Sequence, residues 1–377
     1  MPPLLIGDFV IPGVPEDDLL KICAKRYRPS QHLKGKRTVA LLFTPSVGAH
    51  RETWQTAIER LFLIQDSNIA SANVMISEAW ALEYPNHGRA AIINERALFK
   101  RPQGIGAHLF ARAILRFLNS GLAKADSIVP VGYSASTCVI ILTTNGMDLD
   151  KLLYPMMILV EPPMMTREVL AKASKRTGPN SPHAQLEMVI AAIVGKRGSW
   201  PTRQDARLWL SRRPPWKDWE PRVLDLFVEF ALRDLPTETY PDAKGGVTLR
   251  CTRQQEVTGY TYHQDAIDGV ERLTELCPIL PIHCIFGEKT DLIAAETQAA
   301  LLDPNSGRKM ASVARIPGAG HLVVQEQPFK LAECIFALTV SVNELVLVPW
   351  RSEQLEDSLH FDSFSSTRLG CFVNYYS

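Results

Sequence analysis

The sequence predicts an α/β fold in which a mostly parallel sheet carries helices on both faces. Buried-strand patterns alternate with amphipathic helices from about residue 38 to residue 160, and the alternation resumes after residue 280. One of these strands runs directly into Gly132-Tyr133-Ser134-Ala135-Ser136, a tight turn that leads into a helix. Strands that alternate with helices form parallel sheets, because each helix returns the chain to the edge where the previous strand began.

The predicted elements follow in order along the chain. The strands are continuous apolar or β-rich runs, at Thr38–Phe43, Asn73–Glu83, Ser127–Val131, Met156–Val160, Pro281–Phe286 and Ser312–Ile316. The helices place apolar residues three and four positions apart, at Glu52–Leu63, Ile105–Leu118, Ser136–Leu142, Asp291–Leu302 and Phe329–Val340.

The character of the sequence changes after Glu161-Pro162-Pro163. The following stretch reads as mostly helical and contains four tryptophans. We predict that residues 163–264 form a helical lid inserted into a core made of residues 1–162 and 265–345. Tryptophans of this kind more often pack in a core than bind sugars or bases. If this lid covers the site, they would line an apolar acyl pocket. Residues 346–377 are polar and serine-rich and are predicted to form a C-terminal tail.

Composition argues against several classes of protein. Lys and Arg number 41 against 40 Asp and Glu, so no basic surface for nucleic acid is expected. No apolar run reaches the roughly 18–20 residues of a membrane span. Seven scattered cysteines without CxxC spacing argue against a disulfide framework and a zinc cluster. We expect a cytoplasmic protein. A peroxisomal location is less expected, because the C-terminus Tyr376-Ser377 lacks a targeting tripeptide.

The segment Gly132–Ser136 is typical of a nucleophile elbow. In this motif a serine sits on a strained turn between a strand and a helix, and the turn exposes its hydroxyl. The residues two before and two after must be small, as Gly132 and Ser136 are, although Ser136 replaces the usual second glycine. The pentapeptide alone also fits a serine that merely caps a helix. Its position after a strand and before a helix favours Ser134 as a nucleophile.

A serine nucleophile needs a base, because its hydroxyl is too weak an acid to ionise unaided. In the chain order serine, acid, histidine, the base lies near the C-terminus. Gly318-Ala319-Gly320-His321 follows the last predicted strand there, and its glycines allow the loop to reach over the sheet edge. We therefore predict His321 as the base, rather than one more histidine on a surface loop.

Two carboxylates could orient the imidazole of His321. Asp291 follows the penultimate predicted strand, and Glu161 ends the strand after the nucleophile. Asp291 could instead cap the helix that follows it, and Glu161 could be a solvated strand end. Spacing alone leaves the choice between the two carboxylates open.

A hydrolytic site of this kind also needs donors for a developing oxyanion. The helix that starts at Ala135 offers its first backbone N–H. The second donor normally comes from the loop after the first core strand, where Val47 N–H is the candidate. We predict Ala135 and Val47 as the oxyanion hole.

With these residues placed, the chain resembles the fungal α/β-hydrolases of secondary-metabolite and toxin biosynthesis, among them acyl-CoA hydrolases. The resemblance spans about residues 10 to 345 and rests on the order of short motifs: Ile11-Pro12-Gly13, Arg51-Glu52-Thr53-Trp54, Trp80-Ala81-Leu82-Glu83, Asn86-His87-Gly88, Gly132–Ser136, Glu161-Pro162 and Gly318–His321. It implies an α/β-hydrolase fold with a lid and a serine esterase or thioesterase that uses no metal or organic cofactor. The implied substrate is a small apolar acyl ester or thioester.

The resemblance also implies that the acid follows the strand after the nucleophile, which selects Glu161 over Asp291. Three features depart from the family pattern. Pro45-Ser46 replaces the His-Gly of the oxyanion loop, the acid is Glu rather than Asp, and the peroxisomal tripeptide of several relatives is absent. The altered oxyanion loop favours one alternative, a non-catalytic ligand-binding protein of the same fold. A further alternative is a lyase or cyclase that uses the same triad on a polyketide intermediate.

Overall fold

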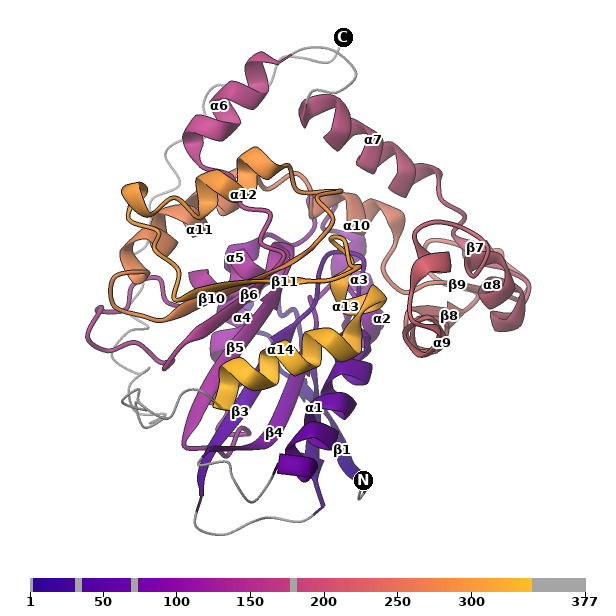
Figure 1. Ribbon diagram of the computed structural model, residues 1–377. Coiled ribbons are helices and arrows are strands. Elements are labelled where there is room, and N and C mark those ends of the chain that lie inside the picture. The colour runs from indigo at the N-terminus through magenta and orange to yellow at the C-terminus, as the bar shows by residue number, and fades with distance from the viewer. Residues whose placement is uncertain (1–2, 31–35, 69–73, 177–181, 341–377) are drawn as a thin grey trace.

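The computed structural model describes residues 3–30, 36–68, 74–176 and 182–340 (Figure 1). The predicted C-terminal tail, residues 346–377, and the last five residues of the predicted core lie outside these ranges. An eight-stranded sheet with the order β1-β2-β4-β3-β5-β6-β10-β11 forms the centre. Its strands are β1 (Leu4–Ile11), β2 (Ile22–Pro29), β3 (Arg37–Thr44), β4 (Val74–Leu82), β5 (Ser127–Tyr133), β6 (Met157–Val160), β10 (Ile282–Gly287) and β11 (Ser312–Ile316).

The sheet is parallel except at one edge, where β2 pairs antiparallel with both β1 and β4. Helices cover both faces, as the strand–helix alternation predicts. Helices α1 (Gln55–Asn68) and α14 (Pro328–Val340) pack together on one face, and α4 (Ala107–Asn119), α5 (Ala135–Leu142) and α11 (His263–Leu276) lie on the other (Figure 1). The core also contains the α-helices α2 (Gly88–Ile93), α3 (Glu95–Phe99), α12 (Ala295–Leu301) and α13 (Val323–Glu326), and short 3-10 helices at Pro15–Asp17, Arg51–Trp54 and Pro304–Ser306.

The side chains of β3 explain why this strand lies at the centre. Alternate residues of a strand point to opposite faces. Ala40 and Leu42 join the hydrophobic cluster beneath α4 and α5, whereas Leu41 and Phe43 join the cluster beneath α1 and α14. A strand buried on both faces must be apolar along its whole length, which is the pattern that the sequence shows.

The segment between β6 and α11 is an insertion with its own small core. It contains α6 (Arg167–Lys175), α7 (Pro182–Gly195), α8 (Arg203–Leu210), α9 (Pro221–Phe230) and α10 (Arg253–Thr258), and the strands β7 (Ser199–Trp200), β8 (Leu232–Asp234) and β9 (Val247–Leu249). The three strands form a separate antiparallel sheet, so the predicted lid is not wholly helical. Figure 1 shows α6 and α7 beyond α12 and the small sheet to the side of the core. The lid boundaries at 163 and 264 remain a prediction.

The four tryptophans of the insertion, Trp200, Trp209, Trp216 and Trp219, form a chain of ring contacts with centroids 5.8 to 6.5 Å apart. Trp200 belongs to the insertion's hydrophobic cluster and the other three pack against it. They therefore stabilise the insertion and do not line the cavity beside Ser134. Within the described ranges, no helix is long and apolar enough to cross a membrane. The cellular compartment remains a prediction.

Candidate active site

Ser134 occupies a strained turn between β5 and α5. Its φ of 55° and ψ of −126° lie in a region that residues other than glycine rarely adopt. The turn brings the backbone so close that a Cβ at Gly132 would lie 2.7 Å from the carbonyl oxygen of Ser136 and 2.9 Å from Thr137 Cα. Glycine is therefore required at 132. Ser136, where a second glycine is usual, donates a hydrogen bond to the carbonyl oxygen of Pro45 at 2.5 Å, which joins the elbow to the loop after β3.

His321 reaches Ser134 from the loop that follows β11. Its Nε2 lies 2.9 Å from Ser134 Oγ, and the imidazole is buried. Gly318 has a φ of +80°, and a Cβ at Gly320 would lie 2.0 Å from a carboxylate oxygen of Asp291. Both glycines of the loop are thus needed to place the histidine over the sheet edge.

Glu161 completes a chain of hydrogen bonds on the other side of the ring. It is buried at the end of β6 with a φ of 53°, and its Oε2 lies 3.0 Å from His321 Nδ1. Its second oxygen, Oε1, accepts a hydrogen bond from the backbone N–H of Gly287 at the end of β10. With Nδ1 donating to Glu161, Nε2 is left as the acceptor for the Ser134 hydroxyl.

Asp291, the other carboxylate that the sequence offers, contacts the same histidine differently. Its Oδ1 accepts hydrogen bonds from the backbone N–H of His321 at 2.9 Å and of Leu292 at 2.7 Å. The helix beyond it begins at Ala295 rather than at Leu292, so Asp291 is not its N-cap. Asp291 fixes the histidine loop, whereas Glu161 contacts the ring.

Tyr133, the residue just before Ser134, was not among the predicted site residues. Its hydroxyl lies 2.9 Å from the carbonyl oxygen of His321 and 3.0 Å from Gln325 Oε1. Burial, reinforced by the charge of Glu161, raises the pKa of this phenol well above its usual value. The hydroxyl therefore stays protonated and tethers the histidine loop to the elbow. An aromatic residue inside the elbow motif was the only sequence signal for this role.

Val47 and Ala135, the predicted oxyanion donors, face one cavity. Ala135 is the first residue of α5, and the first amides of a helix have no acceptor within it. The loop that carries Val47 is fixed on either side: Gly48 N–H donates to His87 Nε2 at 2.9 Å, and Ala49 N–H donates to Ser46 O at 3.2 Å.

His87 is itself held in one tautomer. Its Nδ1 lies 2.8 Å from Asn86 Oδ1, and Asn86 Nδ2 donates to Gln255 Oε1 at 3.2 Å. Nδ1 therefore carries the proton and Nε2 accepts from Gly48. Burial, together with the charges of Lys196 and His50, lowers the pKa of His87 to about 3. The imidazole is thus neutral, as an acceptor must be.

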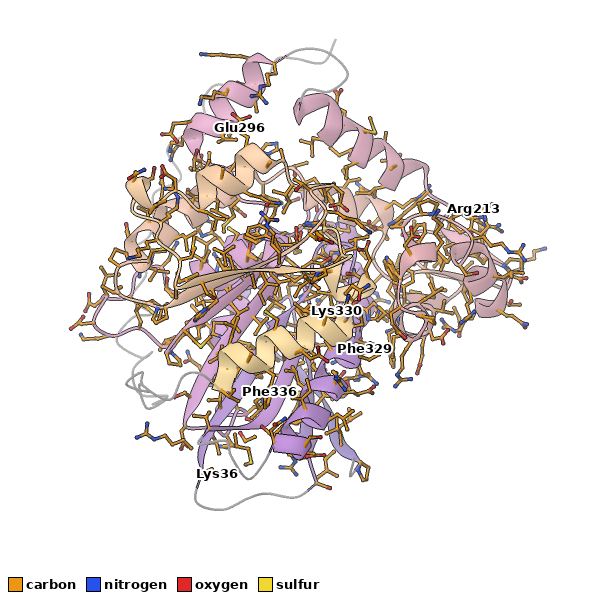
Figure 2. The ribbon with its side chains drawn as sticks, in the orientation of Figure 1. Lys36, Arg213, Glu296, Phe329, Lys330 and Phe336 are labelled. Carbon is orange, nitrogen blue, oxygen red and sulfur yellow. The ribbon has the colours of Figure 1, made fainter. Side chains whose placement is uncertain are left out.

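A cavity of about 280 Å³ opens beside Ser134 and His321. It lies between the core and the insertion, and most of its wall is aliphatic: Val47, Ala135, Pro163, Met165, Val169, Ala173, Leu186, Val189, Leu292, Ile293, Ala294 and Leu322. An ion pair of 2.7 Å between Arg176 and Glu296 joins α12 to the end of α6 beside it, and Figure 2 shows Glu296 between these two helices. Among the described residues, no group of three or more His, Cys, Asp or Glu is arranged to hold a metal ion.

Comparison with known proteins agrees with this architecture. The chain superposes on the peroxisomal alpha-beta-hydrolase Lpx1 from Saccharomyces cerevisiae with a TM-score of 0.69 and 17% identity, covering 90% of this chain and 89% of that one. It superposes on the esterase Rv0045c of M. tuberculosis with a TM-score of 0.57 and 16% identity, over 90% and 93% of the two chains. For a thioesterase domain from the curacin biosynthetic pathway the values are 0.56 and 14%, over 88% and 99%.

These identities are low, so the superpositions establish a shared fold. No curated protein matches the sequence. The family model described as the alpha/beta hydrolase family matches residues 41–333, well over half of the chain and including Ser134, Glu161 and His321. The chain therefore belongs to the α/β-hydrolase family.

Proposed function

We propose that the chain is a serine hydrolase that cleaves carboxylic esters or thioesters. The observation that carries the proposal is the chain of hydrogen bonds from Ser134 through His321 to Glu161, at the edge of an apolar cavity. A serine beside one imidazole nitrogen, whose other nitrogen donates to a buried carboxylate, is the arrangement that activates a hydroxyl for attack on a carbonyl.

In the proposed reaction, Ser134 Oγ attacks the carbonyl carbon of the substrate and its proton passes to His321 Nε2. Glu161 holds the ring in place and stabilises the imidazolium that forms. The backbone N–H groups of Ala135 and Val47 hold the oxyanion. His321 then gives the proton to the departing oxygen or sulfur, and in a second round it activates the water that releases the acid.

The aliphatic wall of the cavity favours an apolar substrate. The sequence resemblance to fungal hydrolases of secondary-metabolite biosynthesis adds acyl-CoA-type and polyketide-like thioesters to the substrates to be tested. An ester and thioester panel with increasing chain length, assayed on the purified protein, would rank these classes by kcat/KM.

The first experiment is labelling with a fluorophosphonate, which reacts with activated serines, followed by intact-mass measurement. We expect one adduct on wild type, mapped to Ser134, and none on Ser134→Ala. In His321→Ala the rate of labelling and of ester hydrolysis should fall by roughly 10⁴- to 10⁶-fold. His108→Ala serves as the matched control, because His108 is a partly exposed histidine that pairs with Asp268 and does not line the cavity. An unlabelled but folded wild type, or a Ser134→Ala variant with full turnover, would overturn the proposal.

A further inference from the structure

Two cavities meet at the predicted oxyanion donors. Beside the cavity of about 280 Å³ lies a second one of about 150 Å³. Both are lined by Val47, Ala135, Pro163, Met165, Gly259 and Tyr260. We refer to them as the larger arm and the smaller arm. A substrate whose carbonyl lies at Ala135 could therefore extend in two directions.

The larger arm lies on the histidine side of the nucleophile. His321 and Leu322 line it, and its wall continues over Leu292, Ile293 and Ala294 before α12. This stretch directly follows Asp291, which binds the backbone of His321. Helices α6 and α7 of the insertion supply the facing wall, through Val169, Ala173, Leu186 and Val189.

The smaller arm lies on the opposite side, between the start of α4 and the start of α11. Neither Ser134 nor His321 lines it. Its own apolar residues are Ile105, Ala107, Met164, Leu170, Ala266 and Ile267. Tyr84, Tyr262, His263 and Asp265 add polar groups. Asp265 also accepts a hydrogen bond from Ala107 N–H at 2.5 Å, which joins α11 to the first residue of α4.

The chemistry of acyl transfer indicates which part of the substrate each arm binds. The bond between Ser134 Oγ and the carbonyl carbon forms as the bond to the leaving oxygen or sulfur breaks, and that atom takes the proton from His321 Nε2. The leaving atom must therefore lie within hydrogen-bond reach of His321. When the oxyanion lies at Ala135 and Val47 and the leaving atom lies at His321, the acyl substituent must point away from the histidine.

We propose that the larger arm binds the leaving alcohol or thiol and that the smaller arm binds the acyl group. The favoured substrate is then an ester or thioester with a bulky apolar leaving group and a shorter acyl chain. The charged side chains that line the larger arm, Arg176 and Glu296, pair with each other, so among the described residues the arm offers no unpaired cation to the phosphates of an acyl-CoA leaving group. This inference rests on the proposed hydrolase function and adds a polarity to the site.

The test uses two ester series with the full-length protein: acetates of alcohols from ethyl to octyl, and ethyl esters of acids from acetate to octanoate. Ala173→Phe fills the larger arm and Ala266→Phe fills the smaller arm. We expect Ala173→Phe to lower kcat/KM for octyl acetate relative to ethyl acetate by at least tenfold. Ala266→Phe should lower kcat/KM for ethyl octanoate relative to ethyl acetate by a similar factor. Ala173→Phe should change the relative kcat/KM values of the ethyl esters much less, and Ala266→Phe those of the acetates.

Opposite changes in volume guard against a variant that does not fold. Val189→Ala in the larger arm and Ile267→Ala in the smaller arm should raise the preference for the longer alcohol and the longer acid, respectively. Ala192→Phe makes the same kind of change on an exposed position of α7 that lines neither arm, and should leave both series unchanged.

The outcomes separate this inference from the proposed function. Variants that react with fluorophosphonate at Ser134 but show exchanged preferences, or none, would overturn the arm assignment and leave the hydrolase intact. If the wild-type protein neither reacts with fluorophosphonate nor hydrolyses any ester, both the proposed hydrolase function and the arm assignment are refuted.

Discussion

At the scale of single residues, the structure separates two carboxylates that both touch His321. Glu161 contacts the ring at Nδ1, and Asp291 contacts the backbone N–H. We therefore expect Glu161→Gln to lower kcat by roughly 10³- to 10⁴-fold, because the amide no longer favours the required tautomer or the imidazolium. Asp291→Asn should cost tenfold or less, since its amide oxygen can still accept the His321 N–H. Steady-state kinetics compare the two, and a larger loss in Asp291→Asn would reverse the assignment.

Sequence motifs could locate Ser134 and His321, because a glycine-flanked serine after a strand and a glycine-rich loop before a histidine are local signals. The acid could not be located by spacing, since the ends of adjacent strands β6 and β10 bring two acidic residues to one edge of the sheet. Which of them meets the imidazole depends on backbone conformation, such as the positive φ of Glu161. No local pattern shows this. The catalytic roles of all three residues remain predictions.

At the scale of elements, the turn between β4 and α2 supports the loop between β3 and α1. His87 Nε2 accepts the N–H of Gly48, the neighbour of the proposed donor Val47. We expect His87→Ala to lower kcat by roughly 10- to 100-fold with little change in KM, because a misdirected oxyanion donor weakens binding of the transition state rather than of the substrate.

His87→Gln supplies a matched comparison, because its side-chain oxygen can replace Nε2 as an acceptor and should restore most of the kcat. The same pair of variants should differ in affinity for a trifluoromethyl ketone, which forms the oxyanion, and agree in affinity for a non-reactive ketone. Equal losses of kcat in both variants, or a loss confined to KM, would show that His87 does not position the loop.

Element type followed from periodicity where the elements were long. The predicted strand Thr38–Phe43 lies within β3, and the predicted helix Phe329–Val340 matches α14 to within one residue. The small sheet of the insertion was missed because its strands have only two or three residues, too few for a period-two pattern to emerge. Trp200, which lies in β7, is buried, and the other three tryptophans are partly buried against the same cluster.

At the scale of the whole molecule, the parallel α/β architecture could be predicted because the alternation of strands with helices and the burial of the strands both follow from local sequence patterns. The strand order and the antiparallel edge of β1 and β2 were harder to predict, since they depend on long-range pairing. That edge is attached to the core through ion pairs in which Lys25, Arg51 and Glu52 are buried. Lys25 of β2 forms an ion pair of 2.8 Å with Glu52, and Arg51 pairs with Glu52 at 3.0 Å and with Asp8 of β1 at 2.5 Å.

Glu83 makes this charged region sensitive to pH. It is fully buried just beyond β4. Its Oε1 accepts a hydrogen bond from the N–H of Ala90 at 2.9 Å, whereas its Oε2 has no hydrogen-bond partner among the described residues. Burial raises its pKa from 4.5 to about 7, with Glu52 adding to the effect and Arg51 opposing it. The folded chain therefore holds a proton that the unfolded chain releases between these values. The free energy of unfolding should fall as pH rises from about 4.5 to about 7.

Urea denaturation between pH 4.5 and 8 measures this slope, and Glu83→Gln, which cannot ionise, should flatten it. At pH 4.5 the free energy of unfolding of the variant should be lower than that of wild type, because the neutral carboxyl of Glu83 fits the site better than an amide. This difference in stability should shrink as pH rises. Glu52 provides the contrast. Burial opposes its ionisation, but its hydrogen bond with His50 and the charges of Arg51 and Lys25 outweigh burial and lower its pKa. Its contribution to stability is therefore lost only as pH falls below about 4.5. A slope between pH 4.5 and 7 that survives in Glu83→Gln would mean that another group in the protein takes up the proton.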